Sequence, residues 1–384
     1  MSTLTDGTPS GAGRHERRGT AVVVGASLAS LLTGLSLSRA GYDITMLERS
    51  GPSPRSGAAL GINGDACGGT RLPAGSDGAA RSLWALASGG SASPVQAWSA
   101  VHARLRAAAE ADPRIELRHD TAVTGVGQDD DAAWATTSTG RTLRADVVVG
   151  ADGHRSVVRR GVAPDKPEAT FAGYVLWLGI ADEAAVPAAR RLPRGHDRPD
   201  ILDAGDFCLI GYPLPGEDGS LAPGARRLGW AWFDPTRNDL LREKGCVVGD
   251  VVRRSLRFDA VPDHTYRELA AAARDLWPAP WQDAILDRVE RRAVIGTPIA
   301  EYVPDRLVNG RLALVGNAAH VQTPMTGMGF DASLQDAEAL ADHLAGTSEV
   351  RAALRGYEET RLHGARDLVR SGQQFSRSFA GGGH

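Results

Sequence analysis

The chain has 384 residues and a formal net charge of −3, with 42% hydrophobic and 23% charged residues. This length allows one large or two interwoven domains with a substantial core. A nearly neutral composition gives no support to nucleic-acid binding, and no apolar run reaches the length that spans a bilayer. The cysteines Cys67, Cys208 and Cys246 lie far apart and form no CxxC pair, so we expect a reduced cytoplasmic protein without a zinc site.

The first predicted elements are a strand, a helix and a strand. Residues 1–18 are polar and are predicted to be a disordered tail. A largely β-branched run at residues 20–24 is followed by a leucine-rich helix that ends near Gly41, and the next strand ends at Glu48. In such a unit the helix N-terminus binds a diphosphate, and an acid roughly 20 residues on binds a ribose. The first turn reads GASLAS, so Ser27 and Ser30 stand where a full GxGxxG motif has glycine.

A second motif follows a series of predicted short strands. Arg55 lies in the Gly-, Pro- and Ser-rich stretch before these strands, and Trp98 opens a predicted helix. The strands lead to DVVVGADGHRSVVR at residues 146–159. Asp152 in this motif can cap the following helix, and Gly153 permits a tight turn from strand to helix.

The pattern changes near Thr170. Apolar strands alternate there with polar loops rich in proline and glycine, which predicts an antiparallel sheet. Its aromatic side chains alternate, so we expect some to face a cavity and others the core. Strands are expected at residues 171–180, 207–212 and 228–233, followed by helices at 263–275 and 281–289 and a strand at 291–295.

Residues 310–340 place glycines directly before a helix. The segment reads as a short buried strand, a loop with His320 and Pro324, and then Gly327 and Gly329 at the start of an amphipathic helix. Glycines let backbone N–H groups approach a ligand closely, and the helix dipole is positive at this end. The segment therefore predicts a site for a heteroaromatic ring that becomes negative on reduction. A last helix is expected at residues 350–375.

Three of these stretches resemble motifs of the single-component FAD-dependent aromatic hydroxylases, the para-hydroxybenzoate hydroxylase-like monooxygenases. The third motif is similar to the family's Gly-Asp-Ala-Ala-His, Pro and Gly-x-Gly pattern, with Asn317 in place of the usual Asp. Many relatives have Arg or Gln reaching FAD from the position of Trp98, where we expect a packing role instead. The residues from Ala172 to Trp177 and from Tyr212 to Gly216 are most similar to the dihydroxypyridine hydroxylase branch. The second motif agrees at Asp146, Gly150, Asp152, Gly153, Ser156 and Arg159.

The resemblance implies an α/β fold in which a Rossmann-like FAD-binding domain of the glutathione reductase type is interwoven with an antiparallel-sheet substrate domain and C-terminal helices. The FAD-binding domain is expected at residues 19–165 and 285–384, and the substrate domain at residues 166–284. FAD is the implied cofactor, with NAD(P)H as a transient co-substrate. The implied FAD contacts are Gly25, Ser27, Leu28, Glu48, Arg49, Arg55, Asp152, Gly153, Asn317, Pro324, Gly327, Met328 and Gly329.

The resemblance also implies a monooxygenase that inserts one oxygen atom from O2 into an aromatic or polycyclic small molecule through a flavin C4a-hydroperoxide. Tyr174, Tyr212 and Pro324 are candidate catalytic residues, and no single base stands out. We expect a monomer or homodimer without a nucleic-acid, membrane or metal partner. Two alternatives remain open. One is a related fold that binds a metabolite without redox turnover, and the other is an FAD oxidase or reductase on the same fold.

Overall fold

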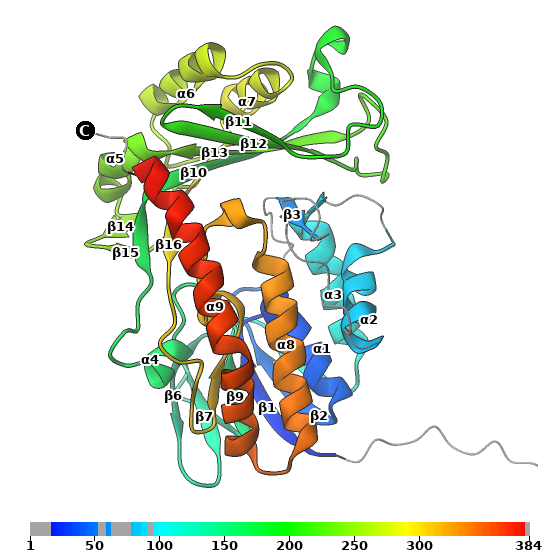
Figure 1. Cartoon of the computed structure of the whole chain (residues 1–384), viewed down its shortest axis with the longest axis vertical. Coiled ribbons are helices and arrows are strands. Elements are labelled where there is room, and N and C mark those ends of the chain that lie inside the picture. Colours follow the sequence, from blue (N-terminus) through cyan, green and yellow to red (C-terminus); the bar gives the residue numbers. More distant parts are fainter. Residues whose placement is uncertain (1–16, 53–58, 63–77, 91–94, 381–384) are drawn as a thin grey trace, which may run out of the picture.

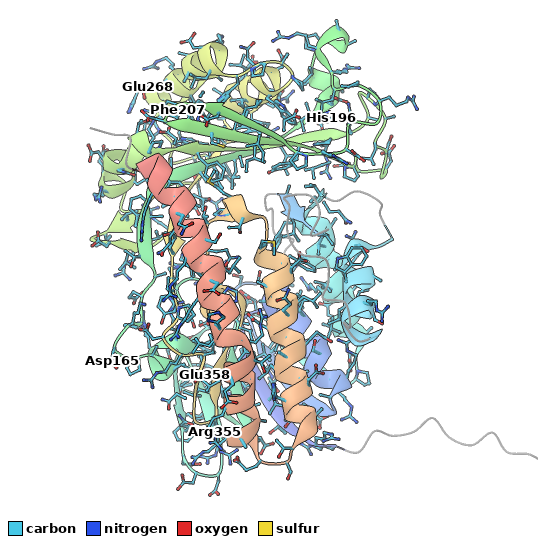
Figure 2. The ribbon with its side chains drawn as sticks, in the orientation of Figure 1. Asp165, His196, Phe207, Glu268, Arg355 and Glu358 are labelled. Carbon is cyan, nitrogen blue, oxygen red and sulfur yellow. The ribbon has the colours of Figure 1, made fainter. Side chains whose placement is uncertain are left out.

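The computed structural model describes residues 17–52, 59–62, 78–90 and 95–380 (Figure 1). Two β-sheets lie one above the other in this view, and the long helix α9 (Val350–Ala380) runs past both and contacts strands of each. Figure 2 labels Glu358 on α9, whose carboxylate accepts the backbone N–H groups of Leu307 and Val308. Among the described helices, none combines the length and the apolar character that crossing a membrane requires.

The lower sheet has six strands, and its central strands are parallel. β1 and β9 contain runs of buried valine, as parallel strands covered on both faces do. Helices α1 (Leu28–Arg39), α3 (Trp98–Ala111) and α8 (Gly329–Gly346) pack together, with α2 (Gly78–Ser88) against α3 and α9 against α8. Across the sheet the order is β17 (Val308–Asn309), β18 (Leu312–Leu314), β9 (Val147–Gly150), β1 (Gly19–Val24), β2 (Tyr42–Leu47) and β5 (Ile115–Arg118).

Two smaller sheets and a short helix complete this part of the molecule. A three-stranded antiparallel sheet contacts β1 and β9, and the short helix α4 (Val158–Val162) contacts β9 and β18. The three strands are β6 (Val123–Gln128), β7 (Ala133–Thr137) and β8 (Thr142–Ala145). A two-stranded sheet pairs β3 (Ala59–Gly61) with β4 (Val95–Ala97).

The upper sheet has seven strands and is antiparallel, as the sequence predicts. Helices α6 (Asp263–Leu276) and α7 (Trp281–Glu290) pack together above it, and α5 (Asn238–Glu243) lies beside β10 and β14. The strands follow the order β11 (Asp200–Ala204), β12 (Phe207–Leu214), β13 (Arg227–Asp234), β10 (Thr170–Asp182), β15 (Val251–Val252) and β14 (Val247–Val248), with β16 (Ile295–Glu301) also paired to β10.

The two faces of this sheet carry different aromatic residues, so these side chains alternate as predicted, while the expectation that some of them face a cavity stays a prediction. Trp177 and Trp232 belong to the core beneath α6 and α7, where the ring of Phe207, labelled in Figure 2, meets Trp232 edge-on at 6.1 Å. A Cβ at Gly211 would lie 2.4 Å from the Trp281 ring, so glycine is needed there for α7 to pack. The opposite face forms a second apolar cluster, which includes residues of the lower part. Its members include Tyr174, Leu176, Tyr212, Phe233 and Ile299 from the sheet and Val95, Ala59 and Met325 from below.

Two predicted boundaries change. The strand expected at residues 291–295 begins instead at Ile295 and pairs with β10 as far as Glu301, so the upper sheet extends beyond residue 284. Pro298 lies in this strand, which is compatible with an edge position, since among the described residues only an isolated bridge between Gly296 and Leu256 forms on the side away from β10. At the N-terminus, Arg17 pairs with Asp43 and the Arg18 N–H donates to Gly41, so these two residues are not part of a tail. Residues 1–16 lie outside the described residues.

One fully buried ion pair joins the start of β13 to the turn after β10. The Arg226 guanidinium donates from Nε and Nη2 to the two Glu183 carboxylate oxygens, each at 3.0 Å. Glu183 also accepts the N–H groups of Leu192 and Gly224, and the two charged side chains are 1% and 0% exposed. Removing one member of such a pair leaves the other charge buried without compensation.

We expect Glu183→Gln to lower the free energy of unfolding by about 3–5 kcal/mol, because Arg226 would remain buried without a carboxylate. Urea denaturation measures this change. Glu110→Gln is the control, since Glu110 pairs with Arg106 on the surface of α3 and exposed pairs contribute little. Equal losses in the two variants would show that the buried pair is not required.

Candidate functional site

A cavity of about 530 Å³ opens at the carboxyl ends of β1, β2 and β9. Its walls come from the β1–α1 turn, the stretch after β9, the loop after β18, the first turn of α8 and strand β3. In doubly wound sheets, ligands bind outside the carboxyl ends of the strands. The N-termini of α1 and α8 both line the cavity, and each presents the positive end of a helix dipole.

The β1–α1 turn is held close to β9. Gly25 has φ +109°, and a Cβ there would lie 2.7 Å from the Ala151 carbonyl oxygen, so only glycine fits. Ser27 is the N-cap of α1 and its side chain makes no capping hydrogen bond, which leaves its hydroxyl in the cavity wall. The Ser30 hydroxyl donates to the Ala151 carbonyl at 3.1 Å. Serine at this motif position therefore joins α1 to the end of β9.

Glu48 is fixed at the end of β2. Its carboxylate accepts the Ala26 N–H and the Ser50 N–H, each at 2.9 Å, and the residue is 5% exposed. Two backbone donors on different oxygens set the orientation of the group. Glu48 lines the cavity beside Leu28 and the exposed Arg49.

The stretch after β9 turns at Asp152 and Gly153. The Asp152 carboxylate accepts the Ser156 hydroxyl at 2.5 Å and the Val157 N–H at 2.7 Å, just before α4. Burial raises the pKa of Asp152, although these donors act in the opposite direction. Gly153 has φ +79°, which allows the turn. Asp152 and Gly153 both line the cavity.

His154 also lines the cavity, and no sequence pattern distinguished it from the other histidines. Its Nε2 is buried and has no hydrogen-bond partner within the described ranges. Burial lowers the pKa of His154 to about 4, helped by the charges of Arg155, Arg159 and Arg49. The imidazole is therefore neutral at pH 7.

Arg159 connects two of the sequence motifs. This fully buried guanidinium donates to the carbonyl of His154 in the second motif and, at 3.0 Å, to the carbonyl of Ala318 in the third. It also donates to the Pro167 carbonyl at 2.8 Å and lies 4.3 Å from the centre of the Tyr302 ring. Burial lowers its pKa, yet the carbonyl oxygens satisfy its donors. The two motifs are thus held in one cavity wall.

Asp336 on α8 fixes the loop after β18. Its carboxylate accepts the Gly316 N–H at 2.9 Å, contacts His320 Nε2 at 2.7 Å and accepts Arg361 Nε from α9 at 2.9 Å. Burial raises the pKa of Asp336, but the charge and hydrogen bond of His320, the charge of Arg361 and the Gly316 N–H outweigh it and lower the pKa to about 2. The carboxylate is therefore ionised across the physiological range.

The loop then turns into α8 through Pro324 and Gly327. Gly327 has φ +65° and caps the 3₁₀ turn Pro324–Thr326. Pro324, Gly327 and Gly329 line the cavity, and so does the exposed Asn317. Met328 does not line it, and its backbone N–H donates to the Thr326 hydroxyl at 3.3 Å.

Most candidate cofactor contacts come together in this cavity. Arg55 lies outside the described residues. Trp98 lines the cavity while its ring stacks on His102 at 4.6 Å, so it both packs and faces the site. Gln322 also lines the cavity and was missed, since only its position two residues before Pro324 pointed to it. The candidates that line the cavity are Gly25, Ser27, Leu28, Glu48, Arg49, Asp152, Gly153, Asn317, Pro324, Gly327 and Gly329.

The two candidate tyrosines lie elsewhere, in the apolar cluster beneath the upper sheet. The Tyr174 hydroxyl lies 2.7 Å from the Thr323 hydroxyl, and the Tyr212 hydroxyl accepts the Ala59 N–H at 3.4 Å. Burial raises the pKa of each tyrosine to about 12. Both remain protonated at pH 7, and neither lines the cavity.

Comparison with known families identifies the fold. The model of a family described as "FAD binding domain" matches residues 79–191 and 259–372, which is more than half of the chain. The chain belongs to this flavoprotein family. A second model, "FAD binding domain-like", matches residues 171–292. FAD is the cofactor of the family.

Relatives of known activity include flavoprotein hydroxylases. A 2,6-dihydroxypyridine 3-monooxygenase of Paenarthrobacter nicotinovorans is 28% identical over 62% of this chain and 58% of its own length. A 3-hydroxybenzoate 6-hydroxylase of Klebsiella oxytoca is 27% identical over 74% of this chain and 63% of its own length. The matches thus span less than two thirds of these relatives. The predicted resemblance to the dihydroxypyridine hydroxylase branch is confirmed by the first of these matches.

Solved structures show the same fold. The 2,6-dihydroxypyridine-3-hydroxylase from Arthrobacter nicotinovorans has a TM-score of 0.77 and 23% identity, over 96% of this chain and 95% of that one. Klebsiella pneumoniae HpxO, solved in complex with FAD and uric acid, has a TM-score of 0.66 and 20% identity, over 93% and 88%. The α/β fold expected for this flavoprotein family is therefore confirmed.

We expect Asp336→Asn to destabilise the protein at pH 7. A carboxyl whose pKa falls from 3.8 to about 2 on folding contributes on the order of 2 kcal/mol above pH 4, and this contribution is lost as the pH falls toward 2. Urea denaturation of the variant and the wild type at several pH values should therefore give curves that converge in acid. Asp342→Asn, an exposed position on the same helix, is the control. A deficit that persisted unchanged to pH 2 would contradict this ionic role.

Proposed function

We propose that the protein is an FAD-dependent monooxygenase that uses NAD(P)H and O2 to add one oxygen atom to an aromatic or polycyclic small molecule. The convergence of two helix N-termini, those of α1 and α8, on one cavity carries this proposal. One N-terminus suits a diphosphate, and the other suits a ring edge that becomes negative on reduction. When bound, FAD supplies hydride acceptance and oxygen activation, while the protein supplies binding, orientation and electrostatics.

The turn around Gly25 suits the adenosine diphosphate half of FAD. The backbone approaches closely at Gly25, and the first-turn N–H groups of α1, including that of Leu28, have no carbonyl ahead of them in the helix. Ser27 can add its hydroxyl to this phosphate site. The fixed Glu48 carboxylate can accept ribose hydroxyls, and Arg49 can pair with a phosphate.

The loop from Asn317 to Gly329 suits the ring and its ribityl chain. Gly327 turns the chain into α8, the first-turn N–H groups from Gly329 onward have no carbonyl ahead of them in the helix, and Pro324 gives a rigid wall beside them. The Asn317 amide can donate to or accept from a ribityl hydroxyl without a charge. Asp152 and Gly153 form the facing wall.

The apolar face beneath the upper sheet suits an aromatic substrate. Tyr212, Phe233 and Met325 belong to the cluster on this face, which joins strands of the sheet to residues beside Pro324. Because Tyr174 and Tyr212 keep their protons at pH 7, neither would act toward a substrate as a base. We propose that NAD(P)H binds transiently. The compartment and the monomeric or dimeric state stay predictions.

The visible absorption spectrum of the purified protein, before and after addition of FAD, is the first test. We expect the two bands of a bound oxidised flavin, and then a stimulation of NAD(P)H oxidation by phenols or hydroxypyridines. Mass spectrometry of the product formed under ¹⁸O2 should show one labelled oxygen atom. Flavin without labelled product would favour an oxidase or reductase. Failure to bind FAD would favour a redox-inactive metabolite-binding protein.

We expect Gly25→Ala to weaken FAD binding about ten- to a hundredfold, because the added Cβ meets the Ala151 carbonyl and the backbone is strained. Fluorescence titration with FAD measures the affinity. Gly140→Ala is a matched control. Gly140 also has a positive φ, +80°, but a Cβ there meets nothing within 4 Å and the residue does not line the cavity. Equal losses in both variants would mean that strain, and not the turn at Gly25, weakens binding.

A further inference from the structure

A distortion in β10 directs Tyr174 out of the regular strand. From Phe171 to Val175 the chain advances four residues along β10 but only two along the paired strand β16, so the register between the two strands shifts. Gly173 in this bulge has φ +91°, and its carbonyl accepts the Asn238 side-chain amide at 2.8 Å. Bulges of this kind redirect a side chain and are common next to active sites. Here the bulge brings the Tyr174 hydroxyl to the turn that carries Pro324.

The Tyr174 hydroxyl belongs to a directional chain of hydrogen bonds. The Ser376 hydroxyl donates to the Glu301 carboxylate at 2.5 Å, so its oxygen accepts from Tyr174 at 3.1 Å. Each hydroxyl donates only one proton, so the Tyr174 oxygen accepts from the Thr323 hydroxyl at 2.7 Å. Thr323 in turn accepts the Met325 N–H at 3.4 Å. Tyr174, Thr323 and Ser376 are 1%, 0% and 3% exposed, so these bonds are shielded from water.

Thr323 is the residue through which this chain reaches the cavity wall. It caps the Pro324–Thr326 turn, its carbonyl accepts the Thr326 hydroxyl at 3.1 Å, and the Thr326 oxygen accepts the Met328 N–H. Helix α9 presses on the same residue, because a Cβ at Gly372 would lie 2.8 Å from a Thr323 methyl carbon. The position of Pro324 and Gly327 therefore depends on β10, α9 and β16 together.

The geometry points to Tyr174 as a positioning residue that sets the Pro324–Gly327 turn against the cofactor ring, with Ser376 and Glu301 fixing its hydroxyl. This role rests on the proposed function. Tyr174 does not line the cavity, and its raised pKa agrees with an orienting role in place of proton abstraction. The chain of hydroxyls joins the upper sheet to the wall that would hold the ring. A displaced turn would leave FAD bound while oxygen transfer loses efficiency, since misplacement of reacting groups is costly.

The test compares flavin-loaded wild type with Tyr174→Phe and Ser376→Ala. We expect both variants to bind FAD, to show altered visible circular dichroism of the flavin, and to convert about tenfold less of the oxidised NAD(P)H into hydroxylated product, with hydrogen peroxide accounting for the rest. Ser376→Thr keeps the hydroxyl and should restore both readouts. Tyr266→Phe is the control, because it removes the buried hydroxyl that donates to the Phe258 carbonyl on the far side of the upper sheet.

The outcomes separate this role from the proposed function. If wild type binds FAD and hydroxylates its substrate while Tyr174→Phe and Ser376→Ala match Tyr266→Phe in both readouts, the positioning role is wrong and the function stands. If wild type binds no flavin, both are wrong. Should Tyr174→Phe fail to fold, the pair Ser376→Ala and Ser376→Thr decides, because it changes only the link that fixes the Tyr174 hydroxyl.

Discussion

The cavity wall depends on the buried carboxylate of Asp336. This one side chain holds the Gly316 N–H at the end of β18, His320 in the following loop and Arg361 on α9. A buried charge is tolerated only when its partners are in place. Asp336 therefore fixes the loop after β18, the start of α8 and the middle of α9 relative to one another. The positions of Asn317, Pro324 and Gly327 in the cavity wall depend on this arrangement.

The parts predicted best from the sequence are those with a strong local pattern. Runs of valine predicted β1 and β9, and the two glycines before an amphipathic pattern predicted the start of α8. Local patterns do not show which distant residues meet. The carbonyl contacts of Arg159 and the approach of Arg361 to Asp336 join segments far apart in the chain, so no periodicity reports them. β16 was misplaced because Gly296 and Pro298 resemble a turn in the sequence.

The departures from the family motifs have separate physical explanations. At Gly25 the space beside the Ala151 carbonyl admits no side chain, whereas at Ser30 the same carbonyl accepts a hydroxyl. Serine can therefore replace glycine at residue 30. The absence of glycine at this motif position does not argue against a ligand site. Met328 shows the reverse case. It lies between two cavity-lining glycines, but the Thr326 hydroxyl holds its backbone N–H. The contact of Met328 with FAD stays a prediction.

The strand order of the lower sheet has a consequence for the order of folding. β9 lies between β1, from the start of the chain, and β18, which begins only at Leu312. Contacts between residues so far apart in the chain form slowly, because the chain loses the entropy of closing the loop before the contacts stabilise it. During synthesis, β10 to β13 can already pair before Gly329 in the cavity wall and Arg361, which supports that wall through Asp336, have been made. We therefore expect a nascent chain to capture its cofactor only after Gly329 and Arg361 have been synthesised.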